Sequence, residues 1–191
     1  MAVLIGIGFV KDHKGAVKKA ALVLWVLLLI MPFLLTGAVH RIIALKNQSV
    51  YGVGIVNELS EGAFSDAMKA VYAADTEEEL PDNVTVPKAK LLKLYTYSPS
   101  LNELSDAFME IWDQWDSADR HPGDGEIEGG WFFWAFREAA QRSGYHSSLQ
   151  KSQEFYGKIA EELNSAHESG SLQMKRKTPM ALLAPIRPEY I

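Results

Sequence analysis

AALVLWVLLLIMPFLLTGAV, residues 20–39, is a run of twenty residues without a charged side chain. At the helical rise of about 1.5 Å per residue the run is about 30 Å long, which matches the hydrocarbon core of a bilayer. Backbone amides cannot stay unpaired in lipid, so a segment of this kind crosses a membrane as a helix. Pro32 is compatible with this because neighbouring groups can satisfy the freed carbonyl. The run therefore predicts one transmembrane helix over 20–39.

Charge is distributed unevenly about this run. Residues 1–46 carry a net charge of +5 and residues 47–191 a net charge of −10. Four lysines lie within the ten residues before the run, whereas one arginine and one lysine follow it. This excess predicts a cell-membrane protein whose N-terminal side is cytoplasmic and whose residues from about 40 onward are extracytoplasmic. The acidic balance of the larger part argues against a nucleic-acid partner, which binds basic surfaces.

The two ends of the chain form separate segments. Residues 1–19 hold a short apolar segment followed by a basic cytoplasmic turn. The apolar segment is too short to span a membrane, and its charges follow it, unlike those of a secretory signal. It fits either the end of an earlier span or an interfacial segment. Residues 175–191 form a proline-rich tail that could lead into a further membrane segment.

Residues 47–174 are expected to form an acidic helical extracytoplasmic domain. Apolar residues at three- and four-residue intervals predict helices over 63–73, 98–115, 130–143 and 148–167. Ser98 and Ser147 are expected to cap two of these helices, and Gly144 to end a third. The chain has no cysteine, so disulfides and thiolate chemistry are excluded. The predicted fold class is mainly α, with one transmembrane helix followed by this domain.

A cluster of aromatic residues lies beside an acidic loop in this domain. The residues of a candidate ligand platform are Trp112, Trp115, Trp131, Trp134, Asp124 and Glu126. Indole rings stack on the apolar faces of sugars while carboxylates bind hydroxyl groups, and tryptophan also suits a membrane interface. The alternative is that two helices cross here and the rings form their core. Trp112 and Trp115 share an apolar stripe with Phe108, and segment 130–136 is apolar all round, so the core interpretation is favoured.

The acidic loop also resembles part of a calcium-binding loop. Asp124, Glu126, Glu128 and Gly129 reproduce the first half of an EF-hand, but Ala135 stands where the bidentate glutamate belongs. Motifs for a nucleophile elbow, a zinc helix, a phosphate loop or a dinucleotide site do not occur. No catalytic residue, metal ligand or cofactor is predicted, and the sequence favours a non-catalytic protein over an enzyme.

Two stretches carry a resemblance: GWFFWAFREAAQRSGY (130–145) and EFYGKIAEELNSAHESGSL (154–172). The chain resembles uncharacterised polytopic membrane proteins of Gram-positive bacteria, in which an extracytoplasmic helical insertion lies between membrane helices. Some of these proteins are labelled glycosyltransferase-like. The resemblance brings no catalytic residues, and it implies that residues 184–191 lead into another membrane segment in longer relatives.

Three functional hypotheses follow. The leading one is a membrane-anchored protein whose non-catalytic outer domain serves interaction or scaffolding at the cell envelope. Its partners would be the lipid bilayer and, beyond that, other membrane helices or envelope glycans. The second hypothesis is a fragment of an envelope glycosyltransferase-like enzyme. The third is a soluble helical protein that buries residues 20–39 in its core.

Overall fold

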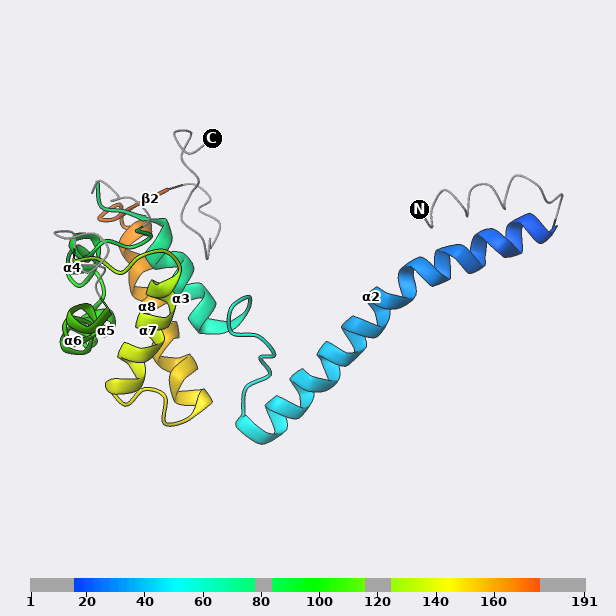
Figure 1. The fold of residues 1–191 in the computed structure, drawn as a ribbon, viewed down its shortest axis with the longest axis horizontal. Helices are drawn as coiled ribbons and strands as arrows, with labels where there is room; N and C mark the ends of the chain where they lie inside the picture. The colour runs from blue at the N-terminus through cyan, green and yellow to red at the C-terminus, as the bar shows by residue number, and fades with distance from the viewer. Residues whose placement is uncertain (1–15, 78–83, 116–124, 176–191) are drawn as a thin grey trace.

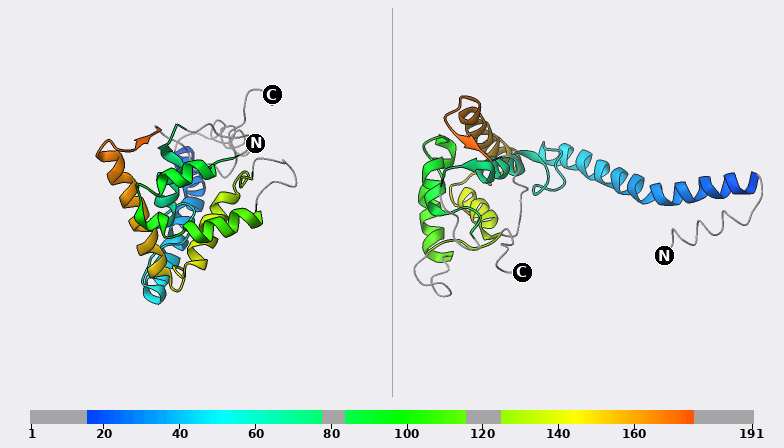
Figure 2. Two further views of the ribbon diagram at one scale, coloured as in Figure 1. Left: turned by 90° about the vertical axis from the view of Figure 1, so that its left-hand side faces the viewer. Right: turned by 90° about the horizontal axis from the view of Figure 1, so that it is seen from above.

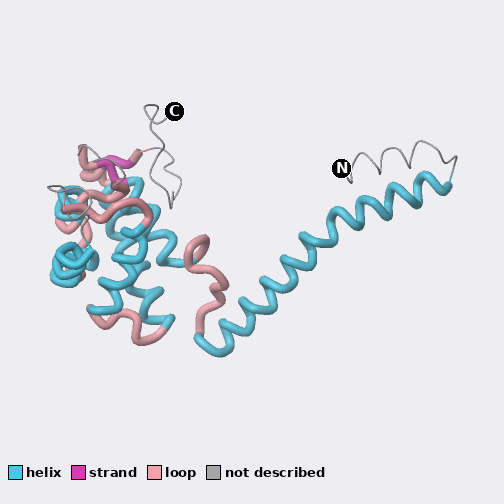
Figure 3. Tube along the Cα trace, viewed as in Figure 1, coloured by secondary structure: helices cyan, strands magenta, loops and turns pink. Residues whose placement is uncertain are grey.

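The computed structural model describes residues 16–77, 84–115 and 125–175, with side-chain surroundings from residue 21 onward. A long helix, α2 (Ala16–Tyr51), projects from a helical domain formed by the later residues (Figure 1). Helix dominates both parts (Figure 3). The fold is therefore mainly α with one long apolar helix near the N-terminus, as the sequence predicts.

Helix α2 continues beyond the predicted span. Residues 40–51, which follow the predicted transmembrane helix over 20–39, add three more turns to it. Neither glycine nor proline occurs between Ala38 and Tyr51, so no residue stops the helix there. Gly52 ends it, because its φ of +73° is a left-handed conformation that favours glycine. The segment that leads into the helical domain thus begins after Tyr51.

The apolar side chains of α2 are left uncovered by the domain. Phe33 is 78 % exposed and Leu34 is 65 % exposed, and most other side chains of residues 21–39 are exposed as well. At Pro32 the carbonyl accepts a hydrogen bond of 2.8 Å from the Thr36 hydroxyl. The helix is long and apolar enough to span a membrane. The hypothesis of a soluble protein that buries residues 20–39 finds no support in the described part of the chain.

The domain contains six helices and one short strand pair among its described residues. The helices are α3 (Gly62–Ala73), α4 (Lys88–Leu94), α5 (Pro99–Asn102), α6 (Ser105–Trp115), α7 (Trp131–Arg142) and α8 (Leu149–Glu168). Strands β1 (Ala74–Asp75) and β2 (Gln173–Met174) pair antiparallel, with Ala74 opposite Met174. The sequence pattern does not predict this pair, because two residues per strand leave no alternation to detect.

Helices α3 and α8 lie side by side and run in the same direction at the centre of the domain (Figures 1 and 2). Their shared core is aromatic: the ring of Phe64 on α3 lies 4.8 Å from that of Tyr156 on α8. Phe136 on α7 lies 5.3 Å from Tyr156, and Phe108 on α6 lies 5.8 Å from Phe132. Edge and offset contacts of this kind hold α6 and α7 against the central pair.

The helix predicted over 98–115 is divided into α5 and α6. Ser98 caps α5 as predicted, since its hydroxyl accepts the Leu101 amide proton at 3.1 Å. The backbone then tightens, and the Leu104 amide bonds the Leu101 carbonyl three residues back. Helix α8 is capped by Ser148 and not by Ser147, while Gly144 ends α7 with a φ of +80° as predicted.

Candidate functional site

Trp112 belongs to the core of the domain. It is 2 % exposed, and its ring lies 5.5 Å from that of Phe108. Its indole N–H is buried and meets no hydrogen-bond acceptor among the described residues. Trp112 therefore cannot stack on a ligand at the surface.

Trp131 and Trp134 have the opposite surroundings. They are 59 % and 54 % exposed, and they lie three residues apart on one side of α7. Trp115 at the end of α6 is half-buried, and its ring meets that of Trp131 edge to face at 6.4 Å. We call these three residues the tryptophan face. The core interpretation thus holds for Trp112 but not for Trp131 and Trp134, because α7 packs only one side against the domain.

Polar side chains follow the two tryptophans along the same side of α7, towards the C-terminal end of the helix. Glu138 follows Trp134 after one turn and accepts a hydrogen bond of 2.9 Å from the Arg142 guanidinium. Arg142 also donates to the Gln114 side chain of α6 at 2.9 Å. The tryptophan face therefore adjoins a set of hydrogen-bonding side chains that joins α6 to α7.

Of the two acidic members of the predicted platform, Glu126 is bonded at the start of α4. Both carboxylate oxygens of Glu126 accept the backbone N–H of Lys88, at 2.9 and 3.1 Å, at the start of α4. Glu126 thus satisfies an amide that has no partner within α4. Asp124 lies outside the described residues. Within the described ranges no group of three or more histidine, aspartate or glutamate side chains is placed to hold a metal ion.

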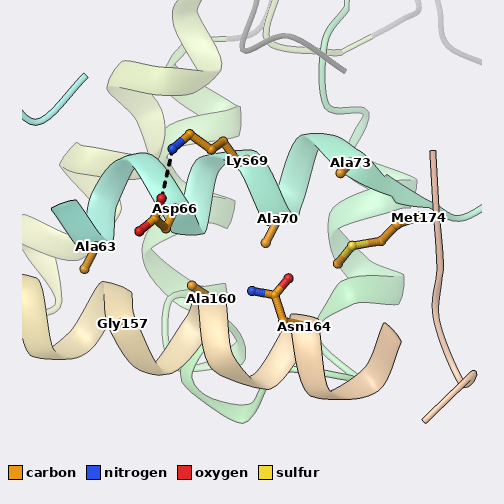
Figure 4. A pocket seen from close by; sticks show the side chains of 9 residues that line it. All are labelled: Ala63, Asp66, Lys69, Ala70, Ala73, Gly157, Ala160, Asn164 and Met174. Atoms are coloured by element: carbon orange, nitrogen blue, oxygen red, sulfur yellow. Dashed lines mark hydrogen bonds and ion pairs between the residues drawn. The ribbon is translucent and has the colours of Figure 1, made fainter. Parts of the chain in front are cut away.

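A groove runs between α3 and α8 on the outer side of the domain (Figure 4). It has a volume of about 540 Å³, and small residues such as Ala70 and Ala160 form its floor. Asp66 and Lys69, which form an ion pair of 2.9 Å, lie on one wall, and Met174 closes one end. The sequence pattern could not reveal this groove, because alanine and glycine carry no chemical signal.

A cluster of ionisable groups forms where the segment after α2 meets α7 and α8. Glu58 forms an ion pair with Arg137, and His146 Nε2 lies 2.8 Å from the Tyr156 hydroxyl. Burial lowers the pKa of His146, and the nearby charge of Arg137 lowers it further. Burial raises the pKa of Tyr156. His146 and Tyr156 are thus both uncharged at neutral pH, which suits a structural link between the α7–α8 turn and α8.

One lysine is buried, and among the described residues no carboxylate is bonded to it. Lys90 on α4 is 6 % exposed, and its ammonium group donates a hydrogen bond of 3.1 Å to the Tyr72 carbonyl. Burial lowers its pKa to about 8, and Lys175 contributes in the same direction. Sequence reasoning missed Lys90, because it lies in a short helix whose lysines look equally solvent-exposed in the sequence.

Comparison with known proteins yields no match. No model of a protein family matches the chain, and neither do curated proteins or solved structures. Any functional proposal therefore rests on α2 and on the surfaces of the domain.

Proposed function

We propose that the protein is a membrane-anchored interaction or scaffolding module of the cell envelope. In this proposal α2 is the anchor, and the domain binds the partners. The observation that carries this proposal is the uncovered apolar surface of α2 over residues 21–39. Exposed apolar area of this extent is unfavourable in water and favourable in lipid.

The direction of insertion follows from the flanking charges. Four lysines precede the uncharged run, and such an excess holds a segment on the cytoplasmic side. The domain would then be extracytoplasmic. Its net charge is negative, which suits a domain that is soluble outside the bilayer.

Alkaline carbonate extraction of membranes from cells expressing the full chain tests the anchor. We expect the wild-type chain to stay in the membrane pellet. Leu28→Arg should weaken insertion by roughly 2.5–3.5 kcal/mol, because it places a charge in the middle of the span. Leu28→Ile is the matched control and should stay with the membrane. Release of the wild-type chain by carbonate would refute the anchor.

A second candidate function is binding of envelope glycans at the tryptophan face. Two exposed indoles beside Glu138 and Gln114 offer stacking surfaces together with hydrogen-bonding groups. The double variant Trp131→Ala/Trp134→Ala should lose binding to isolated cell-wall glycan in a sedimentation assay while keeping its helical circular dichroism. Met109→Ala, which removes another exposed apolar side chain, should bind as the wild type does. Equal binding by the double variant would exclude this face.

A further inference from the structure

The segment that follows α2 turns back along the last turns of that helix. Asn47 on α2 donates a hydrogen bond of 2.6 Å to the Ile55 carbonyl. Gly54 lies against the helix, since a Cβ placed on it would be 3.4 Å from the Ala44 carbonyl oxygen. These contacts place residues 54 and 55 beside residues 44–47, so the chain reverses its direction after Tyr51.

The reversal brings Glu61 to His40. The Glu61 carboxylate lies 3.5 Å from His40 Nε2. The same carboxylate accepts the backbone N–H groups of Val56 at 2.7 Å and Asn57 at 3.0 Å. Those two hydrogen bonds lower the pKa of Glu61, and the nearby His40 contributes further. Glu61 is therefore an oriented carboxylate that joins the domain to α2.

The turn over residues 57–61 is itself well formed. The Asn57 carbonyl accepts the amide protons of Ser60 and Glu61, each at 3.1 Å, and the Asn57 side chain accepts that of Leu59 at 3.0 Å. Asn57 and Ser60 are exposed. The turn thus presents polar side chains outward from a fixed backbone.

The position of His40 along α2 determines how far this turn lies from the bilayer. His40 is the first residue after the uncharged run 20–39, so it reaches the headgroup layer if that run fills the hydrocarbon core. Tyr51 lies eleven residues further along the helix, roughly 16 Å from that layer. The contact between His40 and Glu61 returns the chain across the same distance, so the domain lies beside the last turns of α2 and not beyond its end.

We propose that the turn over residues 57–61 rests on the bilayer surface and that its partner is the lipid headgroup layer. This inference depends on the anchoring by α2 proposed above. The turn holds the domain beside the membrane and fixes its orientation, which a free hinge after Tyr51 would not do. Surfaces of the domain, such as the tryptophan face, then keep one orientation relative to the membrane.

A fluorescent probe on single cysteines tests this position, and the cysteine-free chain needs no prior substitution. The full chain is placed in vesicles of phosphatidylcholine and phosphatidylglycerol that carry a headgroup spin label. The probe on Ser60→Cys should be strongly quenched. The probe on Asn102→Cys should be quenched much less, because Figure 1 shows α5 on the side of the domain away from α2. Equal quenching at both positions would overturn the proposal.

Two further measurements connect this position to the contact with α2. In the Glu61→Gln background, the quenching at Ser60→Cys should fall towards that at Asn102→Cys. A short bis-thiosulfonate reagent should cross-link His40→Cys to Glu61→Cys in the same chain, and Arg41→Cys to Glu61→Cys much less, because the next residue points away around the helix. Cross-linking of both pairs alike would contradict the contact. Carbonate extraction of the same samples reports separately on the anchor.

Discussion

Trp112 and Trp131 carry the same side chain in opposite surroundings. Trp112 is 2 % exposed among aromatic rings, whereas Trp131 is 59 % exposed at the start of α7. Burial of apolar area contributes about 25 cal/mol per Å², and a buried ring that is removed also leaves a cavity. The two residues therefore contribute very differently to the free energy of unfolding, although the sequence places them in one cluster.

Replacing each tryptophan with alanine tests this difference. Trp112→Ala should lower the free energy of unfolding by about 3–5 kcal/mol, because it opens a cavity between α6 and its neighbours. Trp131→Ala should change it by no more than about 0.5 kcal/mol. Denaturant unfolding of the full chain in detergent, followed by circular dichroism, measures both. If the two variants unfold alike, Trp112 is not a core residue.

Lys90 is the second residue whose surroundings predict a measurable effect. Its pKa falls from the ordinary value of 10.5 to about 8, because burial penalises the ammonium ion. Between these two pH values the unfolded chain binds more protons than the folded chain. The free energy of unfolding must therefore rise with pH in this window, and Lys90 adds no pH dependence below it.

The variant Lys90→Met should remove this pH dependence. Between pH 8 and 10.5 the free energy of unfolding of the wild type should rise by up to about 3 kcal/mol relative to that of the variant. Burial also raises the pKa values of the buried Tyr72 and the partly buried Tyr95, so these tyrosines act in the opposite direction above about pH 10. They are present in both proteins, so their effects cancel. Urea unfolding at a series of pH values measures the difference. A constant difference across the window would show that Lys90 is not buried.

At the scale of the elements, the start of α5 is held by a residue of another helix. The Glu162 carboxylate on α8 accepts hydrogen bonds from the Ser98 hydroxyl at 2.6 Å, the Ser100 amide at 3.0 Å and the Ser100 hydroxyl at 2.8 Å. Ser98 and Ser100 are buried, so their polar groups need these partners. The carboxylate thereby fixes the start of α5 against α8.

Glu162→Gln tests this link between helices. The amide can replace only part of the acceptor capacity of the carboxylate, so the free energy of unfolding should fall by about 1–3 kcal/mol. Glu161→Gln is the matched control, because Glu161 is the exposed neighbour on the same helix, and it should change stability by about 0.5 kcal/mol or less. Thermal unfolding of both variants compares them directly. Equal melting temperatures would exclude a structural role for Glu162.

Local periodicity predicted the helices whose apolar stripes face the core. The segments 63–73, 130–143 and 148–167 agree with α3, α7 and α8 to within a residue or two. The break within 98–115 could not be predicted in this way, because the backbone tightens locally at Leu104 while the apolar stripe continues through it. The exposure of Trp131 and Trp134 was missed for a related reason. A helix that is apolar all round gives no indication of which side the fold will cover.

At the scale of the whole molecule, composition predicts the long apolar helix but not its relation to the domain. Twenty uncharged residues are sufficient to identify α2. The return of the chain along α2 depends on single contacts, such as the one between Asn47 and Ile55, which no periodicity indicates. Single contacts also separate the members of the candidate ligand platform. Glu126 bonds the start of α4, and Trp112 is in the core.

The direction in which α2 would cross a membrane is a separate prediction that the flanking charges supply. Basic residues next to a span are retained on the cytoplasmic side during insertion, and four lysines within the ten residues before position 20 outnumber the two basic residues after position 39. Single cysteines at Gly15 and Asp113 should therefore differ when intact cells are treated with a membrane-impermeant maleimide. Asp113→Cys, which is exposed on α6, should be labelled, and Gly15→Cys should be labelled only after the cells are made permeable. The reverse pattern would place the domain in the cytoplasm, where envelope glycans could not be its partners.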